Sequence, residues 1–183
     1  MPSTCQALEA ILKSCDNNTG GIYGIWITPQ DNIASITPLD PAAPLATWQV
    51  TNITLAPPGT TLFENYYIRR NTSSFTEEAA IDLINGSSFV TATISLMFQR
   101  READKSRAIK ILGSGQQYLT AVVLDANGIY WYFPYLQVTG VAEGSGTARA
   151  DGSKYAVTLL SENEYLAYEV DMTAVNLALI GIS

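Results

Sequence analysis

The alternation of apolar and polar side chains along this sequence predicts a chain made mainly of β-strands. It is clearest over residues 90–99, where Val90, Ile94 and Phe98 share one face and polar residues occupy most of the other. Strict alternation over this length is typical of a strand that buries one face. Apolar, β-branched and aromatic runs predict further strands at 22–28, 32–37, 47–55, 117–124, 128–133, 155–160 and 165–170.

Turn-forming residues indicate how neighbouring strands connect. Asn127-Gly128 supplies the positive φ angles of a tight turn, so it predicts a hairpin between 117–124 and 128–133. The last two strands, 155–160 and 165–170, are expected to pair through the turn at 161–164. Residues 140–152 are rich in glycine, which is typical of a flexible loop or a hairpin tip.

Two segments leave alternatives open. The run Glu77–Ala80 favours a helix, but residues 74–83 can equally pair as a strand with the extended, aromatic-rich stretch 61–70. Near the N-terminus, apolar residues at helical spacing suit an amphipathic helix over about 4–14, and an extended arm is the rival interpretation. We therefore expect one β-rich domain over 1–183 with an N-terminal arm over about 1–20.

A change of composition after residue 99 predicts one α-helix at about 101–112. The stretch 100–112 holds five of the ten basic residues, its apolar members follow helical spacing, and Gly113 supplies a stop. The basic run is interpreted as the solvated face of a helix that packs on the core, or alternatively as a patch that faces DNA.

The composition excludes several functions. The chain has no histidine, so it contains no Ser-His-Asp or Cys-His catalytic system and no histidine metal ligand. Ten basic against seventeen acidic residues give a net charge of −7, which argues against gripping nucleic acid or anionic membranes. We find no catalytic carboxylate pair, metal motif or cofactor motif, so no enzyme, metal or cofactor is expected.

A long segment of about 38–85 is expected to project from the domain as a loop or hairpin. Its aromatic and apolar side chains need either the core of the domain or a partner surface, because large exposed apolar patches are rare on monomers. The tail Val175–Ile182 is apolar on both faces and would fray unless it docks on its own sheet or on a neighbour. The inter-subunit contacts expected from these two segments are Phe63, Tyr66, Tyr67, Ile68, Phe75, Leu177, Leu179 and Ile180.

The order of these features resembles the tail and ring proteins of tailed bacteriophages, in particular those of phages that infect Bacteroidetes, including the crAss-like group. The resemblance spans most of the chain and rests on feature order and short motifs. These are the Cys-Asp-Asn-Asn-Thr-Gly-Gly-Ile opening at 15–22, the strand at 89–99, the helix at 101–112, the Leu-Asp-Ala-Asn-Gly-Ile-Tyr-Trp hairpin at 124–131, the Ser-Gly-Thr-Ala loop at 145–148 and the Tyr-Ala-Val-Thr-Leu strand at 155–159.

The resemblance implies a β-sandwich or partly closed barrel of antiparallel strands with one flanking helix. It implies a virion structural protein, assembled in the bacterial host cytoplasm, whose copies form six-fold or twelve-fold rings of the tail or head-to-tail conduit. Tube, adaptor and stopper remain alternatives, with other tail or portal-proximal proteins as neighbours. DNA would pass through the lumen without sequence-specific binding, and the net charge of −7 predicts that acidic side chains outnumber basic ones there.

The main rival is a carbohydrate-binding or receptor-binding β-sandwich module of a virion or cell-surface fibre. Trp26, Trp48, Trp131 and the tyrosines are its candidate sugar platforms. No apolar stretch reaches the roughly 20 residues that a membrane-spanning helix needs, so no membrane partner is expected.

Overall fold

The fold is described from a computed structural model of the chain, which describes residues 11, 15–37, 49–57, 62–114 and 117–182. A nine-stranded sheet dominates it, in the order β5-β1-β8-β9-β10-β7-β6, with β11 and β3 paired beside β9 and with β2 and β4 as a separate pair. The elements are β1 (Ile22–Pro29), a 3-10 turn (Gln30–Asn32), β2 (Ile33–Thr37), β3 (Gln49–Val50), β4 (Asn52–Leu55), β5 (Glu64–Asn65), β6 (Ser74–Asp82), β7 (Ser87–Gln99), α1 (Ala103–Ser114), β8 (Leu119–Asp125), β9 (Tyr130–Gly144), β10 (Lys154–Asn163), β11 (Tyr168–Val170) and a 3-10 helix, η3 (Leu177–Ile180).

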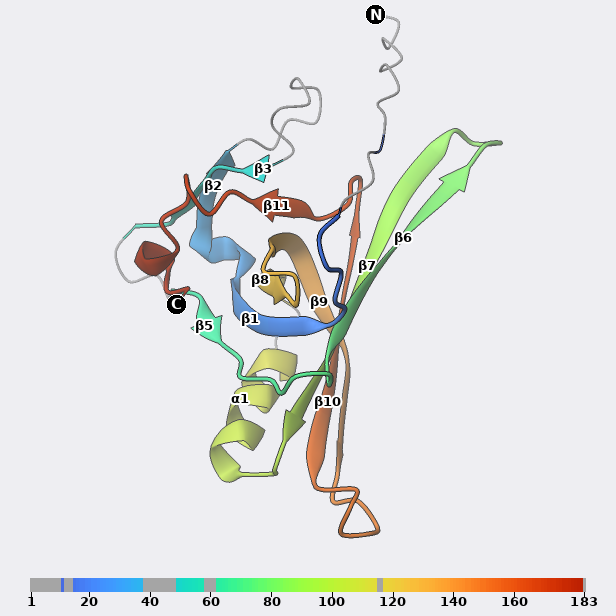
Figure 1. Ribbon diagram of the computed structural model, residues 1–183, viewed down its shortest axis with the longest axis vertical. Helices are drawn as coiled ribbons and strands as arrows, with labels where there is room; N and C mark the ends of the chain where they lie inside the picture. Colours follow the sequence, from blue (N-terminus) through green and yellow to red (C-terminus); the bar gives the residue numbers. More distant parts are fainter. Residues whose placement is uncertain (1–10, 12–14, 38–48, 58–61, 115–116, 183) are drawn as a thin grey trace, which may run out of the picture.

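The fold class predicted from the sequence is confirmed. The protein is mainly β, its strand pairs are antiparallel except for β11 with β3, and the sheet does not close. Within the part of the chain that the structure describes there is one α-helix, at Ala103–Ser114, where the sequence predicts 101–112. Figure 1 shows the long strands β7 and β10 along the longest axis, with α1 beside the body.

Strand β9 joins the two layers of the sandwich. Its first part pairs with β8 and its second part, from Gln137 on, pairs with β10. Between them the register shifts at Pro134 and Tyr135, and Tyr135 has a positive φ of 54°. Proline cannot donate to a ladder, and a bulge bends a strand, so this bulge is where β9 leaves one layer for the other. The Gln30 side chain stabilises the bulge by accepting a hydrogen bond from the Tyr135 backbone N–H at 3.3 Å.

The main core lies between the two layers. Alternate side chains of β7, from Val90 to Phe98, face inward and are buried, as the alternation predicts. Those from Ala92 to Phe98 pack against the inward side chains of β1, β8, β9 and β10, and Ile109 and Leu112 of α1 join the same cluster. The helix is therefore held by its apolar stripe, and its basic residues stay at the surface.

A second core covers the outer face of β1, β8 and β9. Trp26, Val122 and Tyr132 of these strands pack against β3, β11 and the C-terminal segment. The apolar tail thus docks on its own chain, and it is locked there by the Phe63 backbone N–H, which donates to the Ile180 carbonyl at 2.9 Å.

Three sequence predictions about the strands are corrected. Residues 155–160 and 165–170 do not pair with each other, because β10 continues to Asn163 between β7 and β9, and β11 pairs with β9 and β3. The strand expected over 47–55 is broken at Thr51, whose N–H donates to the Thr37 carbonyl. Residues 74–83 form a strand, but it pairs with the following β7 and not with the stretch before it.

The remaining predictions have mixed outcomes. The hairpin predicted at Asn127-Gly128 is confirmed as β8–β9, and residues 145–153 form the tip of the β9–β10 hairpin. Within the range of about 38–85, the residues that the structure describes include β3, β4, β5 and β6, of which β6 leaves the body (Figure 1), whereas 38–48 and 58–61 lie outside the described residues. The helix expected at about 4–14 lies outside the described residues apart from Ile11.

Candidate functional site

The tip of the β6–β7 hairpin exposes a cluster of aliphatic side chains. Leu83 and Ile84 are 90% and 94% exposed, and Ile81 on the adjoining strand is 70% exposed. Figure 1 shows the hairpin projecting well beyond the body at one end of the long axis. Exposed apolar clusters on projecting segments mark interaction sites in proteins that are otherwise well packed. We call Ile81, Leu83 and Ile84 the hairpin tip.

The hairpin tip has a defined turn that holds these side chains outward. Asp82 Oδ1 accepts hydrogen bonds from the backbone N–H groups of Ile84 at 2.8 Å and Asn85 at 3.2 Å, and its other oxygen accepts from the Asn85 side chain. These bonds, chiefly the one from the Asn85 side chain, lower the pKa of Asp82. Gly86 follows with a φ of 66°, which a side chain would make unfavourable. Hydrogen bonds therefore define the turn, and its apolar side chains are exposed to solvent.

Strand β6 leaves one edge of the sheet open. It is the last strand of the sheet path and pairs only with β7 among the described elements. An open edge can pair with another chain, and proteins protect such edges with charges. Glu78 is exposed in the middle of β6, which makes pairing between two copies of this edge unfavourable.

The base of the hairpin is fixed to the body by Glu77. Its Oε1 accepts a hydrogen bond from the Ala167 backbone N–H at 2.6 Å. Burial raises the pKa of Glu77, although the hydrogen bond from Ala167 acts in the opposite direction. Beside this contact is a groove of about 640 Å³, lined mainly by apolar side chains such as Phe89, Trp131 and Leu166. The apolar surface thus extends from the tip down to the body.

A second apolar groove lies between α1 and the segment around β5. It has a volume of about 440 Å³ and is lined by Glu64, Asn65, Tyr66, Tyr67, Phe98, Lys105, Ala108, Ile109 and Ile111. Tyr66 packs on Phe98 with ring centroids 6.1 Å apart and forms its floor. Burial raises the pKa of the Tyr66 hydroxyl, with a smaller contribution from the charge of Glu64. Tyr67 and Ile111 are exposed at its rim. We call this the helix groove.

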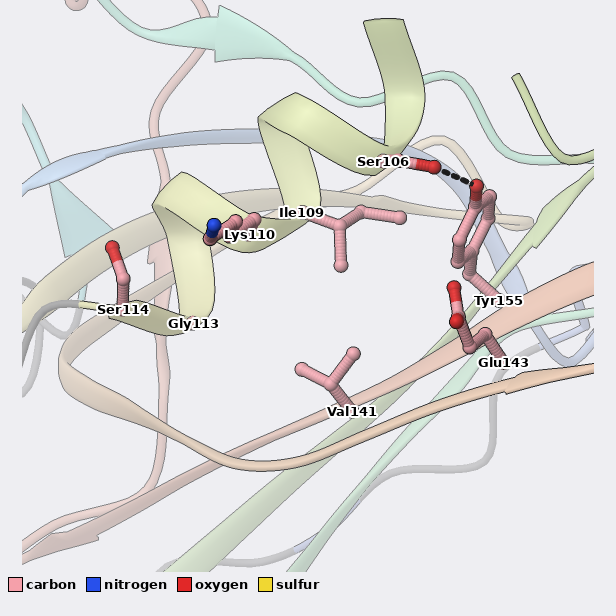
Figure 2. A pocket seen from close by; sticks show the side chains of 8 residues that line it. All are labelled: Ser106, Ile109, Lys110, Gly113, Ser114, Val141, Glu143 and Tyr155. Carbon is pink, nitrogen blue, oxygen red and sulfur yellow. Dashed lines mark hydrogen bonds between the residues drawn. The ribbon is translucent and has the colours of Figure 1, made fainter. Parts of the chain in front are cut away.

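Figure 2 shows the cleft on the other side of α1, facing the β9–β10 hairpin. The Ser106 and Tyr155 hydroxyls are hydrogen-bonded to each other across it. Arg101 forms an ion pair with Glu143 at 3.1 Å at the same end of the helix. Gly113 allows the end of the helix to approach Val141, whose Cγ2 would lie 3.3 Å from a Cβ at this position. These contacts hold α1 against strands β9 and β10.

Two exposed tyrosines form a different surface where β9 bulges. Tyr118 and Tyr135 are each about half exposed, and their rings meet edge to face with centroids 5.9 Å apart. They border a shallow polar cleft that also includes Gln137, Glu162 and Asn163. An aromatic face beside amide and carboxylate groups is a combination that can bind a polar ligand.

The eight contact residues predicted from the sequence do not gather in one place. Phe63 and Ile180 are buried in the second core, where Leu177 also packs. Tyr66, Ile68 and Phe75 are partly buried against the main core. Tyr67 and Leu179 are exposed, at 85% and 73%. Of this set, Tyr66 and Tyr67 belong to a surface groove.

The sequence interpretation missed the hairpin tip. Its signal was present, since Leu83 and Ile84 directly precede the turn residues Asn85-Gly86, a position where apolar side chains have no partner of their own. Of the candidate sugar platforms, Trp26 is buried and Trp131 is partly buried, whereas Trp48 lies outside the described residues.

The described part of the chain adds neither a metal site nor a membrane-spanning helix to these surfaces. In the described part of the chain, no three or more Cys, Asp or Glu side chains are grouped so that they could hold a metal ion. No helix in that part is long and apolar enough to span a membrane. The chain matches no protein-family model, and no curated protein is significantly similar to it.

Proposed function

We propose that this chain is a structural subunit of a phage tail, whose copies assemble into rings of the tail or head-to-tail conduit that DNA passes through. The observation that carries the proposal is the hairpin tip, with Leu83 and Ile84 almost fully exposed on a projecting hairpin whose turn is held by Asp82. Burying apolar surface contributes about 25 cal/mol per Å², so such an arm gains stability by docking on another molecule.

The rest of the molecule supports a building block that repeats. A sandwich with two apolar cores supplies a rigid frame, and the projecting hairpin and the helix groove offer two different contact surfaces. Contacts between two different surfaces of identical copies generate rings when the rotation closes. The sparse charge of the chain, 15% of residues, favours wide subunit contacts because fewer ions have to be desolvated.

The test is the assembly state of the purified chain and of a tip variant. We expect the wild type to elute as an oligomer in size-exclusion chromatography with light scattering, and Leu83→Ser/Ile84→Ser to shift towards monomer. Met172→Ser is the matched control, since Met172 is an exposed apolar residue outside the hairpin. A wild type that stays monomeric at all accessible concentrations would contradict the proposal.

One observation favours a second candidate function, binding of a carbohydrate. The exposed Tyr118–Tyr135 pair lies beside Gln137, Glu162 and Asn163, and the Tyr135 backbone is held at a positive φ. Unfavourable backbone angles on non-glycine residues cluster at functional sites. Glycan-array binding that is lost in Tyr118→Ala would support a sugar-binding module, whereas an array without hits would remove this candidate.

A further inference from the structure

We propose that the hairpin tip of one copy docks in the helix groove of the next copy. This inference rests on the proposed function, because it names the two surfaces through which the ring would form. The inference goes beyond the proposed function by pairing the tip of the β6–β7 hairpin with α1, and Figure 1 shows the tip and the helix towards opposite ends of the molecule.

The two surfaces match in polarity. The hairpin tip presents only aliphatic side chains, and the helix groove is lined largely by Tyr66, Phe98, Ala108 and Ile111. The groove has about 440 Å³, which falls within the roughly 300–1,000 Å³ of pockets that enclose small ligands. It can therefore receive aliphatic side chains from a hairpin turn.

The hairpin segment and the helix segment also carry opposite net charge, while Glu64 and Lys105 balance among the residues that line the groove itself. Residues 74–99, which form the hairpin, contain the acidic residues Glu77, Glu78 and Asp82 and no basic residue. Residues 100–114 contain five basic residues and two acidic ones. Opposite potentials steer two surfaces together and disfavour wrong pairings.

Part of the positive charge near the helix groove is available to a partner. Lys105 lines the groove and pairs with Glu102 at 3.2 Å, and Arg101 pairs with Glu143. Arg107 and Lys110 are exposed on the same helix and form no ion pair with any residue that the structure describes. Arg107 lies one helical turn before Ile111, which lines the groove, whereas Lys110 lines the cleft on the other side of α1. Lys105 and Arg107 are therefore the basic residues of α1 that an acidic hairpin at the groove would meet.

The geometry requires a second copy. The hairpin tip and α1 lie towards opposite ends of the molecule, so the hairpin cannot reach its own groove (Figure 1). A tip-to-groove contact is heterologous, and each copy then offers one tip and one groove to different neighbours. The alternative, two hairpins pairing through their β6 edges, brings Glu78 of one copy towards Glu78 of another and ends in a dimer.

A charge exchange between the two surfaces tests the pairing. One variant, Glu78→Lys/Ala80→Lys/Ser87→Lys, gives residues 74–99 three basic and two acidic residues and keeps Asp82, which shapes the turn. The other, Lys105→Glu/Arg107→Glu, changes the basic residues nearest the groove and leaves residues 100–114 with three basic and four acidic residues. We expect each variant alone to need about tenfold or more protein than the wild type for assembly, because like charges then meet at every contact. Mixed in equal amounts, the two variants should assemble again, because each hairpin then finds a groove of opposite charge.

A position-specific cross-link gives a measurement independent of charge. Ile84 is replaced by the photoreactive benzoylphenylalanine, and circular dichroism verifies that all variants keep the β-rich fold. We expect intermolecular cross-links to peptides from 64–67 or 103–114. Cross-links to 74–90 of another copy, or a mixture of variants that fails to assemble, would overturn the docking.

The outcomes separate the two proposals. If the wild type forms rings while both charge variants assemble equally well, the docking is wrong and the proposed function stands. If the wild type stays monomeric at every concentration, both fall.

Discussion

Single residues hold the C-terminal segment against the second core, and Gly181 is the clearest case. It has a φ of 89°, and a Cβ at this position would lie 2.9 Å from both Leu62 Cβ and the Phe63 carbonyl oxygen. Glycine is therefore required twice, once for the left-handed backbone and once for the close approach. Gly181 thus allows the segment around η3 to lie close to Leu62 and Phe63.

We predict that Gly181→Ala lowers the free energy of unfolding by at least about 1–3 kcal/mol, the cost of holding a non-glycine residue in this region. The close contacts should add to that cost. Gly86→Ala is the matched control, because Gly86 also has a positive φ but nothing lies within 4 Å of its Cβ. Urea denaturation measures both variants, and an equal loss at the two positions would contradict the role given to the close approach.

Glu77, at the base of the hairpin, has a pKa that differs between the folded and the unfolded chain. Because burial raises its pKa in the folded protein, the unfolded chain loses this proton first as pH rises. The contribution of Glu77 to stability is thus complete below the usual glutamate range and is lost as pH rises through the raised pKa.

We predict that Glu77→Gln, compared with the wild type, gains relative stability between pH 4 and pH 7. The amide oxygen can still accept the Ala167 hydrogen bond, and the buried charge is gone. Denaturation at both pH values measures the difference, with Glu78→Gln at the exposed neighbouring position as the control for the loss of one charge. A stability difference that is constant or falls with pH would contradict this explanation.

At the scale of elements, β7 is one of the strands that build the main core. It pairs with β6 on one side and β10 on the other, and its inward side chains lie in the middle of the main core. Ile94 is fully buried there, whereas Ser95 next to it is exposed.

We expect Ile94→Ala to destabilise the protein by about 2–5 kcal/mol, because it removes buried aliphatic atoms and leaves a cavity. Ser95→Ala, on the opposite face of the same strand, should change stability by roughly 0.5 kcal/mol or less. Thermal or chemical unfolding compares the two. A similar small effect at both positions would mean that β7 is not buried as described.

The same elements show what could be predicted from the sequence. The strand β7, the helix α1 and the β8–β9 hairpin follow from local patterns: alternation, helical spacing and an Asn-Gly turn. The partners of β10 and β11 were mispredicted because strand pairing is decided by packing over long distances in the chain. Pro134 and Tyr135 illustrate this, since the bulge that sends β9 into a second layer leaves no local pattern that fixes its direction.

The candidate site was less predictable than the fold. In the sequence, Phe63 and Ile180 look like interface residues. In the structure both are buried in the second core, where the Phe63 backbone N–H donates a hydrogen bond to the Ile180 carbonyl. Apolar side chains carry no local sign of whether their partner belongs to the same chain. Leu83 and Ile84 became candidates because the structure leaves them uncovered at the end of a hairpin.

At the scale of the whole molecule, the charge of −7 is unevenly distributed. Residues 100–114 hold five of the ten basic residues, which leaves five basic and fifteen acidic residues in the rest of the chain. If the acidic hairpin of a neighbour covers the basic helix, the surfaces that stay free are strongly acidic.

We therefore predict that the assembled protein does not retard duplex DNA in a gel-shift assay at about 0.15 M salt, since binding of phosphates depends on clustered Lys and Arg. Lys105→Glu/Arg107→Glu, as free subunits, serves as a control in which residues 100–114 carry three basic and four acidic residues. Tight DNA binding by the assembled wild type would contradict an acidic passage for DNA.

The central claim is that copies of this chain assemble through their projecting hairpins into closed rings. Negative-stain electron microscopy of the purified wild type tests it most directly. We predict rings with a central hole, six-fold or twelve-fold and single or stacked, and their absence from Leu83→Ser/Ile84→Ser. Uniform monomers, or dimers without a central hole, in the wild-type sample would contradict the claim.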